Sequence, residues 1–217
     1  MNATRFVSIL AGVLVASACS ADRPTSPLQP EPPSLTDLEQ SEQDRVEERA
    51  VESEVVYDSL IVEWATGQRN RNPAVTWCEP EHYAAVVQIV GPEGATLAMG
   101  SHRLQIPPGA LEDSVVITAE VEVDLVTSVR LSPHGLRFDV PPILTLDYEH
   151  CEPPGWARTR DHDDDDDDDD DDDRQAQRVA YITDDEQVLE LPVATDRPAS
   201  KVVEALLEHF SRYAVAY

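Results

Sequence analysis

From Tyr83 onward the chain alternates short apolar segments with turn residues, roughly every eight to twelve residues. No helical pattern separates these segments, so they predict an all-β fold, specifically an antiparallel β-sandwich. The expected strands are Ala84–Val90, Thr96–Met99, His102–Ile106, Val115–Val123, Val129–Ser132, Ile143–Tyr148, Arg178–Thr183 and Val188–Leu191, followed by a long final segment, Val202–Tyr217. Asp184–Glu186 is expected to form a hairpin tip.

The stretch GATLAMGSHRLQIPPGAL, residues 94–111, constrains the fold most closely. It predicts two strands around Gly100, the second of which ends at two prolines that cannot donate ladder hydrogen bonds. Gly109 permits a sharp reversal, so that Leu111 turns back towards the core.

The segment Val115–Val123 alternates between apolar residues and residues such as Thr118, Glu120 and Glu122. This period of two predicts a sheet with one buried face and one face in water.

The N-terminus predicts export. Residues 1–18 form a signal peptide, with Arg5 ahead of an apolar run that is shorter than the about 20 residues needed to span a membrane. The small residues before Cys19 resemble a bacterial lipobox, which implies that Cys19 carries palmitate or another acyl chain and becomes the mature N-terminus. The alternative is a cleaved secretory signal without lipid. With lipid, the chain would be a membrane-anchored protein of the bacterial cell envelope, at the outer membrane or cell surface.

Two segments separate this anchor from the strands. Residues 19–34 are rich in proline and predict an extended tether. Residues 35–66 predict an acidic helical or linker segment, in which Thr36 and Glu39 match a capping box and the apolar stripe is thin. Val55–Trp64 is compatible with either helix or strand.

If Cys19 is lipidated, Cys78 and Cys151 are left as an even pair in an oxidising compartment, which predicts a disulfide. A zinc site that adds His82 and His150 is the alternative. It is disfavoured because neighbouring residues of an extended strand point to opposite faces.

The net charge is −27, which argues against binding to nucleic acid or anionic headgroups. Eleven of the negative charges form the run Asp163–Asp173. Within 161–173 this predicts a solvated, disordered poly-Asp loop, with weak calcium binding as the alternative. The candidate calcium ligands are Asp161, Asp163, Asp165, Asp167, Asp169, Asp171 and Asp173.

Several motifs occur together in one order: GPEGA at 91–95, LQIPPGAL at 104–111, LSPHGLRFDVPPILTLDY at 131–148 and HFSRY at 209–213. They resemble the ZU-five domain, the β-sandwich of zonula occludens proteins, netrin receptors and ankyrins. The domain would occupy residues 78–217, with the motif likeness covering about 84–217. This resemblance implies a protein-interaction role, with an unknown protein or envelope partner and no small-molecule catalysis. In it, Pro107–Leu111 and Pro133–Phe138 are scaffold features.

Some ZU-five proteins cut themselves within His-Phe-Ser, which here is His209-Phe210-Ser211. The resemblance implies that Ser211 attacks the Phe210 carbonyl with His209 as base. The alternative is that Phe210 is a core residue at a strand entry. Only residues 211–217 would be released, so an interaction module is the leading expectation; self-cleavage and calcium-dependent adhesion are the alternatives.

Overall fold

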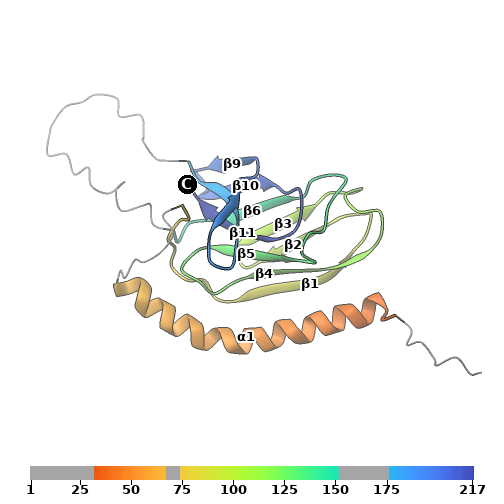
Figure 1. Cartoon of the computed structure of the whole chain (residues 1–217), viewed down its shortest axis with the longest axis horizontal. Helices are drawn as coiled ribbons and strands as arrows, with labels where there is room; N and C mark the ends of the chain where they lie inside the picture. The colour runs from red at the N-terminus through yellow and green to blue at the C-terminus, as the bar shows by residue number, and fades with distance from the viewer. Residues whose placement is uncertain (1–31, 67–73, 152–175) are drawn as a thin grey trace, which may run out of the picture. The chain divides into compact units, whose positions relative to one another are not determined.

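A computed structural model describes residues 32–66, 74–151 and 176–217 of the chain. The predicted signal peptide 1–18, the acceptor Cys19, most of the tether and the poly-Asp loop at 161–173 lie outside these residues, so they stay predictions. The described residues form one α-helix and two antiparallel sheets, consistent with the predicted β-sandwich (Figure 1).

The larger sheet has six strands in the order β1-β4-β5-β11-β7-β8. Their bounds are β1 (Ala84–Val90), β4 (Val115–Val121), β5 (Ser128–Ser132), β11 (Arg212–Ala216), β7 (Arg178–Ile182) and β8 (Val188–Glu190). The smaller sheet has five strands in the order β2-β3-β6-β10-β9. They are β2 (Ala95–Met99), β3 (His102–Ile106), β6 (Ile143–Asp147), β10 (Val202–Leu206) and β9 (Ala194–Arg197).

The main core fills the space between the two sheets. Most strands contribute alternate residues, and the pattern is strict in β3, where His102, Leu104 and Ile106 are buried and the residues between them are exposed. The largest fully buried core side chains include Tyr213, Phe210, Leu97, Met99, Leu104, Ile106, Ile117, Leu131, Leu144 and Leu146. A second small cluster, with Val75, Val126 and Ala214, covers the other face of β11 and explains why that strand is buried on both sides.

The turn after β3 confirms the reversal that residues 94–111 predict at Gly109. Gly109 adopts a φ of 77° and its N–H donates to the carbonyl of Pro92 over 2.8 Å. The N–H of Ala110 donates to Pro107 across the turn. Leu111 is buried in the main core, so the chain does turn back inward, as expected.

The predicted helical segment is a single helix, α1 (Leu35–Thr66), which resolves Val55–Trp64 as helix. Its cap differs from the expectation of Thr36 with Glu39. The Asp37 N–H donates to the Ser34 hydroxyl, and the Asp37 carboxylate accepts from the N–H and hydroxyl of Ser34. This is the same reciprocal motif placed two residues earlier, and the hydrogen bonds from Ser34 lower the pKa of Asp37.

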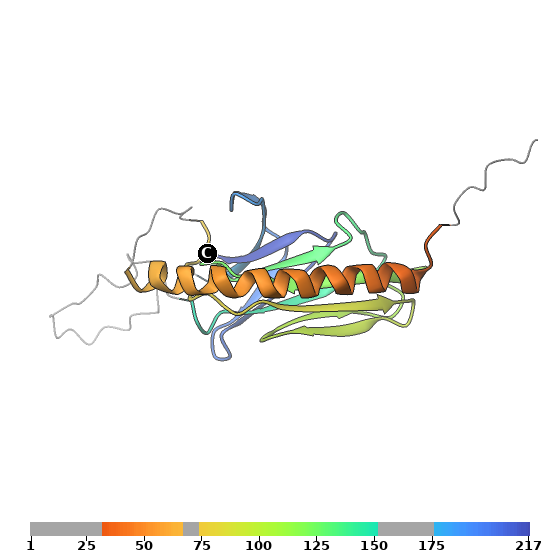
Figure 2. The ribbon, with the colours of Figure 1, turned by 90° about the horizontal axis from the view of Figure 1, so that it is seen from below.

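The expectation that β4 has one face in water is wrong, because α1 lies against that face (Figure 2). Thr118 and Glu120 are only 3% and 4% exposed. Glu42 of α1 accepts a hydrogen bond from Thr118, and Arg49 of α1 pairs with Glu120. The polar residues of this strand alternate because they face a polar helix, and periodicity alone could not separate that from facing solvent.

The long final segment expected at Val202–Tyr217 is two strands in different sheets. β10 ends at Leu206 and β11 begins at Arg212, and residues 207–211 carry the chain from the smaller sheet to the larger one. β9 was not expected, because its sequence ATDR has no apolar alternation. It forms by pairing with β10 at the sheet edge.

The predicted disulfide between Cys78 and Cys151 is confirmed, with the two residues 73 positions apart and paired as an isolated antiparallel bridge. Both sulfur atoms are used in the bond, which removes them as ligands of the alternative zinc site. The bond fastens the segment that follows α1 to the end of the β6 region.

Candidate functional site

The candidate site is the corner formed by residues 207–211 where the chain crosses between the sheets. Hydrogen bonds fasten this corner to the segment 133–142. Leu207 N–H donates to Pro142 over 2.9 Å, and Phe210 N–H donates to the carbonyl of Leu136 over 2.9 Å. The carbonyl of Phe210 accepts from the N–H of Gly135 over 2.8 Å. The LSPHGLRF motif therefore lies directly against the HFSRY motif.

Phe210 is a core residue, as the alternative to self-cleavage predicts. Its side chain is fully buried in the main core, with its ring centroid 4.8 Å from that of Phe138. A core Phe fixes the position of its own carbonyl, so this packing holds the Phe210–Ser211 peptide in place beside Gly135.

Ser211 is buried as well, at 2% exposure, and does not lie on a solvent face. Its Oγ lies 3.2 Å from Nε2 of His134, which is 77 residues away in the sequence. The carbonyl of Ser211 accepts from the N–H of Leu131 over 2.9 Å. The hydroxyl, an imidazole nitrogen and the preceding carbonyl with its N–H donor therefore meet at one peptide bond.

His209 has different neighbours. Its ring packs edge-on against Tyr181, and its Nε2 lies 3.8 Å from a carboxylate oxygen of Glu190. Its Nδ1 lies 3.4 Å from the Phe210 carbonyl oxygen and 3.5 Å from the hydroxyl of Tyr213, which donates to the His209 carbonyl over 2.6 Å. Burial, followed by the nearby Glu190, Tyr181 and Glu208, raises the pKa of Tyr213, so this hydroxyl stays protonated.

The turn at 133–136 positions His134 and Gly135. Leu136 N–H donates to the carbonyl of Pro133 over 3.2 Å, and Gly135 has a φ of 78°. A positive φ at the third residue of a four-residue turn is characteristic of type II, which favours glycine there. His134 occupies the second position, so the turn sets both the imidazole and the following N–H against residues 210 and 211.

Sequence reasoning missed both His134 and Gly135 as site residues. The resemblance assigns Pro133–Phe138 only a scaffold role, which hides both residues. The only available signal was that the segment around them belongs to the same motif set as HFSRY. Nothing in one sequence shows that the turn of one motif contacts the dipeptide of the other.

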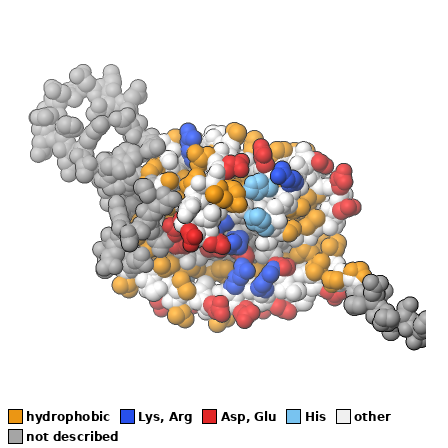
Figure 3. Space-filling view, in the orientation of Figure 1, with side chains coloured by type: hydrophobic (Ala, Val, Ile, Leu, Met, Phe, Trp, Pro, Cys, Tyr) orange, Lys and Arg blue, Asp and Glu red, His pale blue; other side chains and the backbone are white. Residues whose placement is uncertain are grey.

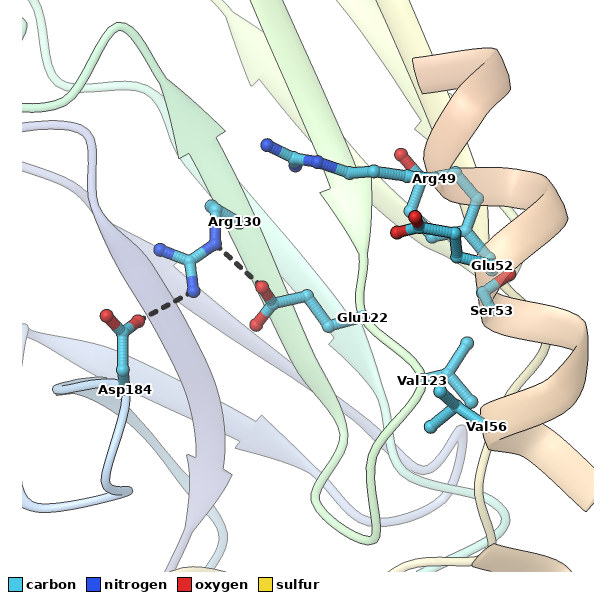
Figure 4. A pocket seen from close by; sticks show the side chains of 9 residues that line it. Arg49, Glu52, Ser53, Val56, Glu122, Val123, Arg130 and Asp184 are labelled. Atoms are coloured by element: carbon cyan, nitrogen blue, oxygen red, sulfur yellow. Dashed lines mark hydrogen bonds and ion pairs between the residues drawn. The ribbon is translucent and has the colours of Figure 1, made fainter. Parts of the chain in front are cut away.

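A hollow of about 470 Å³ lies between α1 and the larger sheet (Figure 4). Arg49 and Glu52 reach it from α1, and Glu122, Arg130 and Asp184 lie across from them. Arg130 pairs with both Glu122 and Asp184 at 2.7 Å, so its charge is already satisfied. Burial acts to lower the pKa of Arg130, but the bonds to Asp184 and Glu122 raise it. The bond to Arg130 lowers the pKa of Asp184. An ion-pair network therefore lines the hollow.

His102 is a structural histidine. It is 1% exposed, its Nδ1 accepts from the N–H of Asp147, and its Nε2 lies 2.9 Å from Glu81. Burial alone would raise the pKa of Glu81, but the hydrogen bond and charge of His102 and a bond from Ser101 lower it. Histidine side chains also gather near the centre of the face in Figure 3, among apolar and charged ones.

Within residues 32–66, 74–151 and 176–217 no group of three or more His, Cys, Asp or Glu side chains is arranged to hold a metal ion. The candidate calcium ligands between Asp161 and Asp173 lie outside the described residues, so calcium binding stays a prediction. In the same described ranges no helix is long and apolar enough to cross a membrane.

Comparison with known proteins gave no match, either to a protein-family model or to a curated protein.

Proposed function

We propose that this chain is an exported, lipid-anchored interaction module of the bacterial cell envelope, without small-molecule catalysis. The lipobox-like residues before Cys19 support the anchor, and the proline-rich residues 19–34 support a tether that holds the sandwich away from the membrane. The ZU-five-like motifs support the interaction role.

The observation that carries the proposal is a group of exposed apolar side chains at one edge of the sandwich. Leu189, Leu191, Val193 and Leu206 are 55%, 46%, 77% and 45% exposed. Residues 191–193 link the edge strand β8 of one sheet to the edge strand β9 of the other. Leu206 N–H donates to the Val193 carbonyl, which brings these two residues together. Clustered apolar surface beside unpaired strand edges is typical of protein-binding surfaces.

Site-specific photocrosslinking in the native host tests this surface. A photoreactive residue at Val193 should give an adduct of one discrete mass, whereas the same residue at Val51, which is 74% exposed on α1, should give none. Leu206→Asp should weaken the adduct formed from position 193. Equal labelling from positions 51 and 193, or no adduct from 193, contradicts the proposed surface.

The anchor is tested separately. Cys19→Ser should move the chain from the membrane fraction to the soluble fraction of the host, because the substitution removes the proposed site of lipid attachment. Unchanged membrane association would contradict lipid anchoring and leave the interaction surface to be judged by crosslinking.

A second candidate function is self-cleavage between Phe210 and Ser211. The observation that favours it is the buried Ser211 hydroxyl next to a Phe210 carbonyl that already accepts an N–H from Gly135 over 2.8 Å. A donor on the carbonyl oxygen is what an oxyanion intermediate requires. Purified wild-type protein should contain a break before Ser211, and Ser211→Ala should abolish it; an intact wild-type chain after prolonged incubation contradicts self-cleavage.

A further inference from the structure

The hydroxyl of Ser211 contacts an imidazole that the cleavage motif does not include. The distance from Oγ to Nε2 of His134 is 3.2 Å, which is within hydrogen-bonding range. His134 is itself exposed, so its side chain is in contact with water. The arrangement combines a buried hydroxyl with a base that is open to solvent.

The residue after His134 contacts the other reacting group. Gly135 N–H donates to the Phe210 carbonyl oxygen over 2.8 Å, and that carbonyl belongs to the peptide bond that Ser211 would attack. Backbone donors aimed at such an oxygen stabilise the charge that develops when the carbonyl carbon becomes tetrahedral. One turn thus supplies both a proton acceptor and an oxyanion donor.

We propose that His134 is the general base of the Phe210–Ser211 cleavage, with Gly135 N–H as the oxyanion donor; this inference rests on the second candidate function. With Nε2 unprotonated, His134 accepts the proton of the Ser211 hydroxyl as Oγ bonds to the Phe210 carbonyl carbon. The C–N bond then breaks, and the proton passes to the Ser211 nitrogen, leaving an ester between Phe210 and Ser211.

Water completes the reaction. It adds to the ester carbonyl, the C–O bond breaks, and the products are a carboxylic acid on Phe210 and a chain that begins with Ser211 and has its hydroxyl restored. No oxidant, reductant or cofactor is required for this sequence, and the only co-reactant is water.

His209 is placed for another role. Its ring contacts Tyr181, Tyr213 and Glu190, and at the reacting bond its Nδ1 lies 3.4 Å from the Phe210 oxygen. A group at that oxygen can assist the carbonyl, whereas proton removal requires contact with Oγ. In this scheme His209 therefore acts at the carbonyl oxygen and does not remove the proton from Ser211.

The test follows cleavage by intact mass in the full chain with Cys19 replaced by serine. The variants are His134→Gln, His134→Ala, His209→Gln and Ser211→Ala, and the urea midpoint of each shows that it is folded. A general base is worth about 10²–10⁴-fold, so His134→Gln should slow cleavage at least about 100-fold. His209→Gln should slow it less, and added imidazole should restore cleavage to His134→Ala. Hydroxylamine should speed cleavage in wild type by capturing the ester.

The outcomes separate the two proposals. If wild type never cleaves, both self-cleavage and the role of His134 are wrong. If wild type cleaves and Ser211→Ala does not, but His134→Gln cleaves at the wild-type rate, only the assignment of His134 is wrong. If His134→Ala is folded and does not cleave, and added imidazole does not restore cleavage, a base role for His134 is contradicted.

A matched pair of glycines tests the N–H donor. Gly135 and Gly109 have φ values of 78° and 77°, and a Cβ at either would meet nothing within 4 Å. Alanine at each position should therefore strain the backbone to a similar extent. Alanine keeps the N–H but disfavours this φ, so Gly135→Ala should slow cleavage by moving the turn that directs the N–H at the Phe210 oxygen, whereas Gly109→Ala should not; equal cleavage in both variants contradicts a role for the 133–136 turn.

Discussion

Glu120 and Ser211 are both buried polar residues, but their surroundings differ. Glu120 on β4 is 4% exposed and carries a charge, which Arg49 of α1 and the hydroxyl of Tyr83 both contact. Ser211, just before β11, is 2% exposed and neutral, and its hydroxyl contacts the exposed His134. One group is held by charge and hydrogen bonds inside a helix–sheet interface, and the other lies between an imidazole and a carbonyl.

This difference separates a buried polar group that the packing of the fold requires from one that it does not require. A buried carboxylate without partners would be costly, so Arg49 and Tyr83 are required for α1 to dock on β4. A serine hydroxyl has a far smaller desolvation cost, and alanine would fill almost the same space. The energetics of folding therefore account for Glu120 but give little reason for Ser211, which is the reason to look for chemistry at the second residue.

The largest expected effect is at the helix–sheet interface. Arg49→Ala leaves the Glu120 charge buried with only Tyr83, and breaking a fully buried pair costs about 3–5 kcal/mol. Because the Arg49 side chain is 41% exposed, we expect a smaller loss, about 2 kcal/mol, in the free energy of unfolding measured with urea.

Arg45→Ala is the control for this prediction. Arg45 pairs with Glu42 one turn earlier on α1, and its side chain is 51% exposed, so the loss should stay below about 0.5 kcal/mol. Equal losses in the two variants would mean that α1 does not depend on Glu120 for docking.

Much of the fold could be predicted from the sequence, because local signals specify it. The turn at Gly109, the disulfide and most strands follow from spacing and residue type. The docking of α1 could not, because its inward face carries Glu42, Val46, Arg49 and Ser53, which do not form an apolar stripe. Polar residues of β4 that face a polar helix produce the same alternation as residues that face water.

Alkaline pH should expose a smaller effect at the same interface. Burial, together with the hydrogen bond to Glu120 and its charge, raises the pKa of Tyr83. A raised pKa means that the folded state retains the proton, so this contribution is complete below the unfolded value of about 10 and is lost as pH rises above it.

Urea unfolding at pH 8 and pH 10.5 measures this dependence. Wild type should lose stability between the two values, and Tyr83→Phe should lose less because its unfolded state has one phenol fewer to ionise. The dependence should not vanish, since the pKa of Tyr213 is raised as well. An unchanged slope in Tyr83→Phe would mean that Tyr83 is solvated like an unfolded tyrosine.

The candidate site was less accessible to sequence reasoning than the fold. HFSRY marked the residues 209–211, but the partner of Ser211 lies 77 positions away on a turn that looked structural. Two antiparallel sheets bring the 133–136 turn to the 207–211 corner, and that contact depends on the order of strands. A sequence motif can indicate which peptide bond would react, whereas the order of the strands decides which side chains surround that bond.

The smallest expected effect is on stability at Ser211 itself, and a second buried serine provides the comparison. Ser128 on β5 is fully buried and its Oγ accepts from the guanidinium of Arg212 over 3.2 Å. Hydrogen bonds to charged groups contribute about 1.5–3 kcal/mol, so Ser128→Ala should cost about 1.5 kcal/mol. Ser211→Ala removes a bond to an exposed imidazole that water can replace, so its cost should be below about 0.5 kcal/mol. If urea unfolding of the uncut chains shows equal losses, Ser211 is a structural hydroxyl, and the contrast with Glu120 disappears.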